Sequence, residues 1–267
     1  MNIIGTSGVG KSFLVSQALE DADYGPDEVA VVMHEDGTES YGPLMKLANL
    51  YPVTTPDTAE VVLDRLIEGA KRGYRLPKLL FYDSLTGMTD YFQADKEDNP
   101  NQVWNPEKKE WARDKRSEYG DMGRWAQKIY LKLRDQIPMD VIVLITSFEG
   151  PLSPIPEIAC EGKVIPKNIT RWSSATLYMK AVPGKATPEE VAADLASGPK
   201  GHRSYGRAAD GSLDGTFISR YFTTQNTGEI MAKGHRNLYL TEPAVLPDVL
   251  RKIRGGTPVV AAPAVTQ

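Results

Sequence analysis

Apolar residues along the first 145 positions form short continuous runs that alternate with longer stretches of helical periodicity. The short runs occupy residues 2–4, 28–33, 78–82 and 141–145, and their length and continuity are typical of strands buried on both faces. The longer stretches occupy residues 12–19, 58–72 and 121–136, and Asp57 or Thr58 is the expected N-cap of the second. This alternation predicts an α/β fold in which a mostly parallel central sheet carries helices on both faces.

The pattern changes after Gly150, where shorter candidate strands appear at residues 176–181 and 216–223. We expect them to form a β-rich C-terminal extension of the same sheet. Residues 93–120 are polar and are interrupted by Pro100 and Pro106, so we expect an exposed excursion or a partly helical hairpin. One domain would then span residues 1–254, and the Gly-, Pro-, Ala- and Val-rich residues 255–267 are expected to be a disordered tail.

Composition narrows the class of protein. The chain has 267 residues, 41% hydrophobic and 25% charged, as in an ordinary globular domain. Cys160 is the only cysteine, which excludes an internal disulfide, and the three histidines have no zinc-ligand spacing. No apolar run approaches a membrane span, and nothing at the start resembles a signal peptide, so we expect a soluble cytoplasmic protein without a membrane partner. The net charge of −4 confines any nucleic-acid contact to a local patch.

The most specific motif lies at the N-terminus, where Gly5–Ser12 matches G-x-x-x-x-G-K-[ST] in full. Its members are Gly5, Thr6, Ser7, Gly8, Val9, Gly10, Lys11 and Ser12. Glycines let such a loop wrap a phosphate closely, and the following helix adds its positive N-terminal end. We expect ATP with Mg²⁺ here, with Lys11 reaching the β- and γ-phosphates and the Ser12 hydroxyl on the metal.

Carboxylates follow two of the predicted strands. Asp83 ends the apolar run 79–82, where an acidic residue that holds magnesium belongs. Glu35 and Asp36 follow the strand that ends at Met33, and either an attacking water is activated there, with Glu35 favoured, or the two are simply turn residues. The strand 141–145 is followed by Thr146 and Ser147, which either sense the γ-phosphate or cap the next segment.

Two basic regions bear on nucleic acid. Residues 108–116 alternate cations with acids and lie near Trp104 and Trp111, a composition that favours a solvated helix face. The Gly-rich stretch 198–207 has a different character and holds Lys200, Arg203, Tyr205 and Arg207. Flexible cationic loops with an aromatic residue suit single-stranded nucleic acid, although an ordinary mobile loop has the same composition.

With these parts in order, the chain resembles a RecA-type ATPase core over residues 1–254, and in particular the RecA-like ATPases of bacteriophages, of the single-strand-annealing and recombination type. The resemblance rests on Gly5–Ser12 and on weaker stretches at residues 80–88, 119–125, 162–169 and 230–238. It implies a RecA-like P-loop fold, ATP hydrolysis on single-stranded DNA, and homo-oligomers with ATP at the subunit interface. Lys233 and Arg236 are then the candidates for a finger that reaches the neighbour's γ-phosphate. A single-strand DNA-binding protein is a further candidate partner, and the location is the host cytoplasm.

Two alternatives stay open. A P-loop kinase of a nucleotide or small metabolite would need an arginine-bearing lid over the donor phosphates. Residues 113–124 could form one, although their acid-rich character argues against it. A nucleotide-binding assembly protein without hydrolysis would use the same loop. Relative to the RecA-type pattern, the first strand is unusually short. The segment His34–Asp36 is not a clear match to the family's carboxylate motif, which leaves the catalytic base unidentified.

Overall fold

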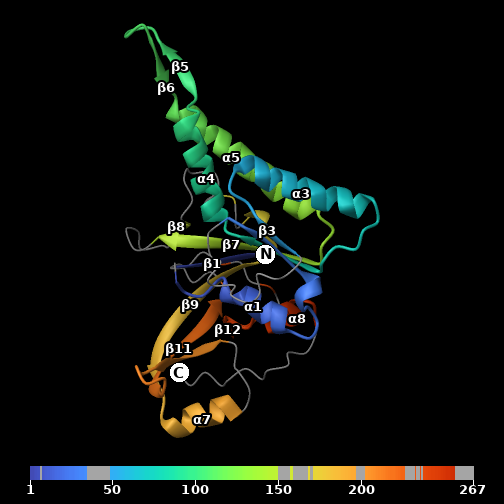
Figure 1. Ribbon diagram of the computed structural model, residues 1–267, viewed down its shortest axis with the longest axis vertical. Coiled ribbons are helices and arrows are strands. Elements are labelled where there is room, and N and C mark those ends of the chain that lie inside the picture. Colours follow the sequence, from blue (N-terminus) through green and yellow to red (C-terminus); the bar gives the residue numbers. More distant parts are fainter. Residues whose placement is uncertain are drawn as a thin grey trace.

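The computed structural model describes residues 1–6, 8–34, 49–149, 157–158, 168, 171–196, 202–225, 232, 235 and 237–255. Its main feature is one large sheet with the strand order β10-β11-β9-β1-β7-β4-β2-β3 (Figure 1). These strands are β10 (Arg203–Arg207), β11 (Leu213–Thr223), β9 (Thr176–Lys185), β1 (Asn2–Thr6), β7 (Val141–Glu149), β4 (Leu79–Asp83), β2 (Val29–Met33) and β3 (Leu50–Pro52). From β9 to β3 all neighbours run parallel, which confirms the predicted mostly parallel α/β sheet.

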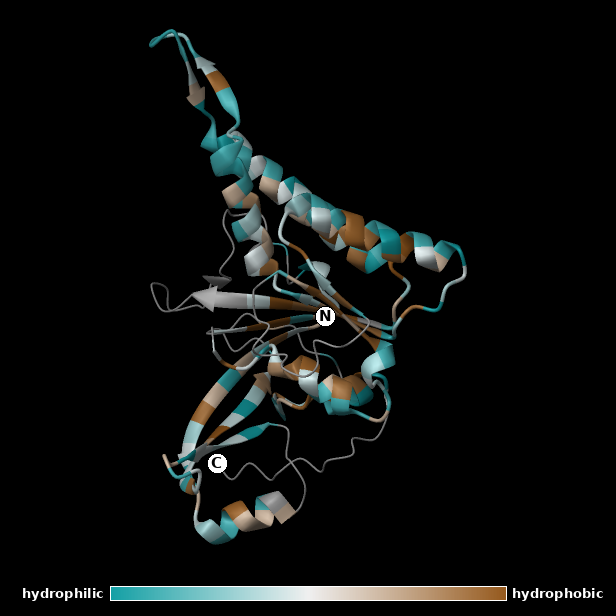
Figure 2. Cartoon of the chain, in the orientation of Figure 1, coloured by the Kyte–Doolittle hydropathy of each residue, from teal (hydrophilic) through white to brown (hydrophobic). Residues whose placement is uncertain are grey.

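Helices cover both faces of the sheet, as predicted. On one face lie α1 (Phe13–Glu20) and α8 (Leu246–Ile253), and on the other α3 (Pro56–Lys71), α4 (Leu85–Asp98) and α5 (Lys115–Leu131) (Figure 1). Successive strand side chains point to opposite faces, so Ile3 and Phe81 join the core under α1 while Ile4 and Tyr82 join the core under α3 to α5. The strands at the centre therefore carry apolar side chains on both faces, whereas the covering helices have one polar face (Figure 2).

The helix boundaries differ from the predicted ones in three places. The N-cap of α3 is Thr55, whose side chain exchanges hydrogen bonds with Thr58 in a capping box, and not Asp57 or Thr58. Helix α4 was not predicted, because its sequence is polar apart from a few buried residues. Helix α5 begins at Lys115 rather than Asp121 and ends in a π-helical turn over Lys132–Gln136.

The excursion predicted for residues 93–120 contains a projecting arm, residues 99–116. The end of α4 leads into a two-stranded hairpin of β5 (Gln102–Asn105) and β6 (Glu110–Arg113), and α5 then returns to the sheet (Figure 1). A partly helical hairpin was among the expectations, but the two strands at its tip were not. The solvated helix face expected for residues 108–116 is wrong for Glu110–Arg113, because this segment pairs with β5 as a strand.

The C-terminal part extends the sheet, as predicted. Strands β9 and β11 pair antiparallel over a longer register than the candidate strands covered, and β10 and β12 (Thr241–Pro243) pair with β11. Helix α7 (Pro188–Ala196), a two-residue strand β8 (Glu157–Ile158) and a 3-10 turn (Pro26–Glu28) complete the described elements. None of the helices in these residues is long and apolar enough to cross a membrane. The predicted tail after residue 255 lies outside the described residues.

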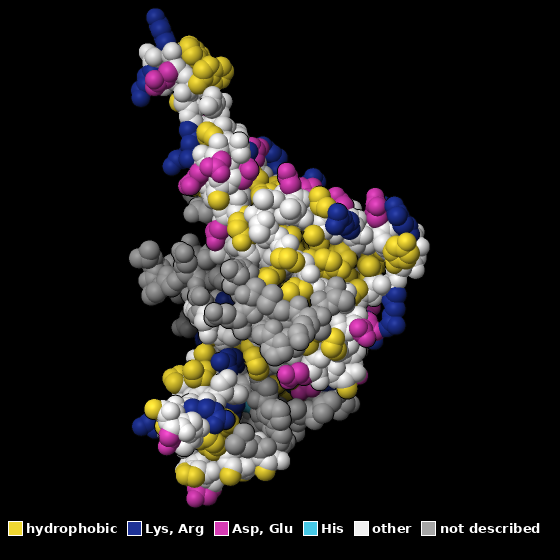
Figure 3. Space-filling view, viewed as in Figure 1, with side chains coloured by type: hydrophobic (Ala, Val, Ile, Leu, Met, Phe, Trp, Pro, Cys, Tyr) yellow, Lys and Arg dark blue, Asp and Glu magenta, His cyan; other side chains and the backbone are white. Residues whose placement is uncertain are grey.

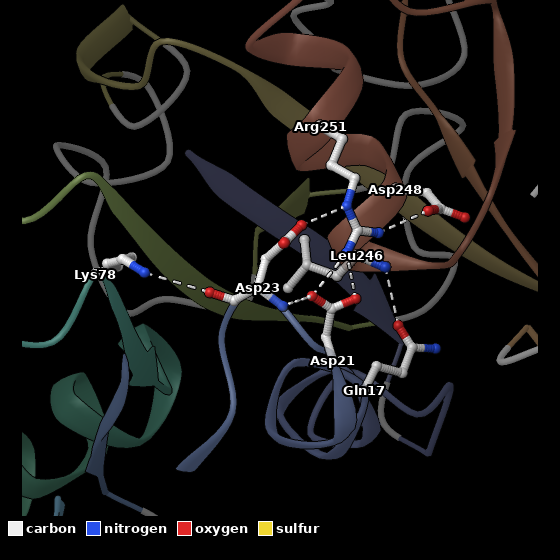
Figure 4. Close-up of polar contacts among 7 residues, drawn as sticks. All are labelled: Gln17, Asp21, Asp23, Lys78, Leu246, Asp248 and Arg251. Atoms are coloured by element: carbon white, nitrogen blue, oxygen red, sulfur yellow. Dashed lines mark hydrogen bonds and ion pairs between the residues drawn. The ribbon is translucent and has the colours of Figure 1, made fainter. Parts of the chain in front are cut away.

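A cluster of ion pairs fixes α8 on α1 (Figure 4). The guanidinium of Arg251 contacts Asp21 at 2.6 Å, Asp23 at 2.8 Å and Asp248 at 3.0 Å. Burial alone would lower the pKa of Arg251, but the carboxylates outweigh it and hold that pKa above its ordinary value. Gln17 adds two hydrogen bonds of 2.9 Å, to the Ala244 carbonyl and from the Leu246 N–H. The helix that follows the Gly-rich loop is thus held at its far end.

Candidate phosphate-binding site

The Gly-rich loop joins the carboxyl end of β1 to the start of α1, the position at which open α/β sheets bind ligands. Gly8 and Gly10 have φ of +74° and +94°, a conformation that side chains disfavour. A Cβ at Gly5 would lie 2.9 Å from Val9 Cγ1 and 3.1 Å from the Met179 carbonyl oxygen. Each glycine of the motif therefore has a steric reason to be glycine.

The loop offers backbone donors and a cation. Within the described part of the chain, the N–H groups of Gly8, Gly10 and Ser12 find no acceptor in the protein. The Lys11 ammonium is buried and folds back over the loop, donating to the carbonyls of Gly5 at 2.9 Å and Thr6 at 2.8 Å. Unsatisfied backbone donors beside a lysine and a helix N-terminus are the components of an anion-binding cradle. Ser7, the remaining member of the motif, lies outside the described residues.

Asp83 meets this loop from a strand that is 71 residues farther along the chain. The Ser12 hydroxyl donates to the Asp83 carboxylate at 2.9 Å, and Asp83 is almost fully buried at the end of β4. A Ser hydroxyl and a carboxylate at this separation are a pair that Mg²⁺ can use together with phosphate oxygens. Among the described residues no three His, Cys, Asp or Glu side chains gather to hold a metal unaided, so a metal here would need further ligands.

Strand β7 lies between β1 and β4 and brings Thr146 to the same edge. Its hydroxyl, however, is buried and donates to the Asn2 side chain at 2.9 Å. This contact ties Thr146 to β1 and is neither of the two roles expected from the sequence, γ-phosphate sensing or capping of the next segment. The side chain of Ser147 lies outside what the structure describes.

His34 continues β2 beside Asp83, and its backbone N–H donates to the Asp83 carbonyl at 2.6 Å. The ring is 2% exposed and packs 4.7 Å from the Tyr82 ring, and neither of its nitrogens has a hydrogen-bond partner among the described residues. Burial lowers the pKa of His34 to about 3, so the ring is neutral at physiological pH. It contributes no positive charge to the site.

Arg220 on β11 is a site residue that the sequence did not reveal. Its Nε donates to the Val9 carbonyl at 2.9 Å and its Nη1 to the Ser204 hydroxyl at 2.7 Å. A Cβ on Gly10 would lie 2.7 Å from the same Nε, so the guanidinium rests directly on the loop. Burial lowers its pKa, and no carboxylate pairs with it within the described chain, although arginine stays protonated in proteins. The signal available in the sequence was a lone arginine in an otherwise strand-like run.

The residues expected to contact nucleic acid form a strand rather than a flexible loop. Arg203 and Tyr205 lie on β10, and both bond to the Asp194 carboxylate of α7, Arg203 at 2.5 Å. Arg203 also donates to Ser219 and lies over the Phe217 ring. Arg207 is exposed and donates to the Gly211 carbonyl. The expectation of a loop is wrong for residues 203–207, because β11 supplies pairing partners for the backbone.

Four further predicted site residues, Glu35, Lys200, Lys233 and Arg236, lie outside the described residues, as does Asp36. The structure therefore brings together Gly5, Lys11, Ser12 and Asp83 from the predicted set and adds Arg220. Comparison of the sequence with protein-family models and with curated proteins finds no match.

Proposed function

We propose that this chain binds and hydrolyses ATP as a RecA-like P-loop protein and that it acts on single-stranded DNA. The observation that carries the ATP part is the 2.9 Å contact between Ser12 and Asp83. It places a hydroxyl that follows a phosphate-binding motif against a strand-end carboxylate, and a mere Gly-rich turn has no reason to meet such a partner. The mostly parallel sheet, with the loop at a strand's carboxyl end, supports the same assignment.

Each residue of the site has a separate role in ATP binding and hydrolysis. The N–H groups of Gly8, Gly10 and Ser12 bind phosphate oxygens, and Lys11 exchanges its two carbonyl contacts for the β- and γ-phosphates. Ser12 and Asp83 hold Mg²⁺, whose chemistry is to neutralise charge on the phosphates. Glu35 is the candidate that orients the attacking water, and Lys233 or Arg236 of a neighbouring copy the candidate finger.

The proposals of a homo-oligomer and of DNA binding come from the resemblance to RecA-type ATPases. ATP would lie between subunits of a homo-oligomer, and turnover would alternate the grip on single-stranded DNA. The kinase alternative loses support, since two arginines of the imagined lid are already paired: Arg113 with Glu118, and Arg124 with Asp121.

The test is to size the protein with and without ATP and single-stranded DNA, in parallel with product analysis. We expect ATP and DNA together to increase the assembly size and phosphate to be released to water. Transfer of phosphate to a nucleoside monophosphate by a monomer would favour the kinase instead, and tight ATP binding without turnover would favour the assembly protein.

A further inference from the structure

The arm, residues 99–116, stands away from the sheet (Figure 1). Hydrogen bonds and an ion pair hold its base against α5. At its base the Asn101 side chain donates to Asp121 at 2.6 Å and to Ser117 at 3.1 Å, and its N–H donates to Glu118 at 3.1 Å. Arg113 pairs with the same Glu118 at 2.9 Å. These contacts hold both ends of the hairpin against α5. An isolated two-stranded hairpin is only marginally stable in water, so these contacts are what fix the position of the tip.

The tip exposes aromatic surface that a folded chain normally buries. Trp104 and Trp111 face each other across β5 and β6 with ring centroids 5.7 Å apart. Their exposed fractions are 48% and 64%. A paired set of half-exposed tryptophans on a projecting element marks a binding surface, because single exposed apolar residues are ordinary but clustered aromatic ones are not.

The charge around these rings has the sign opposite to that of the protein. The arm holds five cations and three carboxylates, a net charge of +2 in a chain of net charge −4. Lys108 and Lys109 are exposed at the turn, and Figure 3 shows basic and hydrophobic side chains side by side at this tip. Lys115 and Arg116 follow at the base and form no ion pair within the described residues.

Lysine is depleted in protein–protein interface cores, whereas lysine with aromatic rings is the combination that single-stranded nucleic acid requires. We propose that the arm is a single-stranded DNA contact in which Trp104 and Trp111 stack on bases and Lys108 and Lys109 neutralise phosphates. The choice of partner rests on the proposed function, but the contact itself needs no ATP. This proposal places the DNA-binding surface on the arm and not on β10. On β10, Arg203 and Tyr205 already bond to Asp194.

The test measures binding of a fluorescein-labelled oligothymidylate by anisotropy, without nucleotide, over a series of salt concentrations. For Trp104→Ala/Trp111→Ala we expect Kd to rise by at least about tenfold, as for the loss of one stacked base or more. For Lys108→Ala/Lys109→Ala we expect the slope of log K against log salt to fall by about 1 to 2. Tyr74→Ala, which removes an aromatic side chain that is 66% exposed elsewhere, is the matched control and should bind as the wild type does.

Trp104→Phe/Trp111→Phe should retain most of the affinity, which separates stacking from a folding defect. Wild-type affinity in the Trp104→Ala/Trp111→Ala protein would overturn the inference, as would absence of any binding by the wild type at low salt. Unchanged DNA binding with loss of self-association in a sedimentation experiment would also overturn it and assign the arm to a second copy. ATP turnover by a protein whose arm binds no DNA would leave the ATPase proposal standing and remove only this one.

Discussion

Arg220 offers the most specific test of how the phosphate loop is held. The change is Arg220→Met, which keeps the length of the side chain and removes the donors to the Val9 carbonyl and to Ser204. The Val9 carbonyl and the Gly10 N–H belong to one peptide group, so a cation that donates to the oxygen also polarises the N–H. Arg220 therefore both fixes the loop and strengthens one of its phosphate donors.

The magnitude follows from the type of bond. A hydrogen bond from a charged donor contributes about 1.5–3 kcal/mol. Arg220 is half-buried and other contacts also hold the loop, so we take the lower end of this energy range. A free-energy change of about 1.4 kcal/mol corresponds to a tenfold change in Kd. We expect Arg220→Met to bind magnesium nucleotide about tenfold more weakly, and Arg220→Lys to fall between it and the wild type because lysine can reach only one of the two acceptors.

The assay is an equilibrium titration with a fluorescent ATP analogue and Mg²⁺, alongside thermal unfolding to show that the variants are folded. The matched control is Arg207→Met, since Arg207 lies on the paired strand β10 and its side chain donates to the Gly211 carbonyl rather than to the phosphate loop. If folded Arg220→Met binds nucleotide within about twofold of the wild type, the loop is organised without Arg220 and the reasoning fails.

Three further predictions concern the metal and the fold. Asp83→Asn should raise the Mg²⁺ concentration needed for nucleotide binding about 10–100-fold, and an unchanged Mg²⁺ titration would contradict its role. Thr55→Ala should lower the free energy of unfolding in urea by about 1 kcal/mol. Asp57→Ala, which removes only an exposed charge at the helix N-terminus, should cost under about 0.5 kcal/mol, and equal losses would contradict the capping box. Arg251→Met should cost about 2 kcal/mol by leaving the partly buried Asp21 and the buried Asp248 unpaired, while Arg254→Met, at an exposed pair, should cost under about 0.5 kcal/mol in the same urea assay.

The central strands and most of the nucleotide loop could be predicted from sequence because both depend on local pattern. Continuous apolar runs such as residues 79–82 have few alternatives to a buried strand, and the motif Gly5–Ser12 fixes its own geometry. Placing Asp83 at the loop needed only the rule that parallel strands end at one edge. The 2.9 Å contact with Ser12 agrees with that expectation.

Long-range contacts account for what the sequence did not predict. Arg220 reaches Val9 only because β11 folds beside β9, a pairing that no local pattern encodes. Arg203 and Tyr205 have the composition of a mobile basic loop, yet strand pairing and Asp194 immobilise them. Helix α4 was missed because its apolar spacing is sparse and its burial comes from packing against the sheet.

Steady-state release of phosphate from Mg²⁺ and ATP tests the central claim most directly. The account predicts turnover by the wild-type protein, faster turnover when single-stranded DNA is present, and background release for Lys11→Ala under both conditions. Equal release by the wild type and Lys11→Ala, with or without DNA, would contradict it.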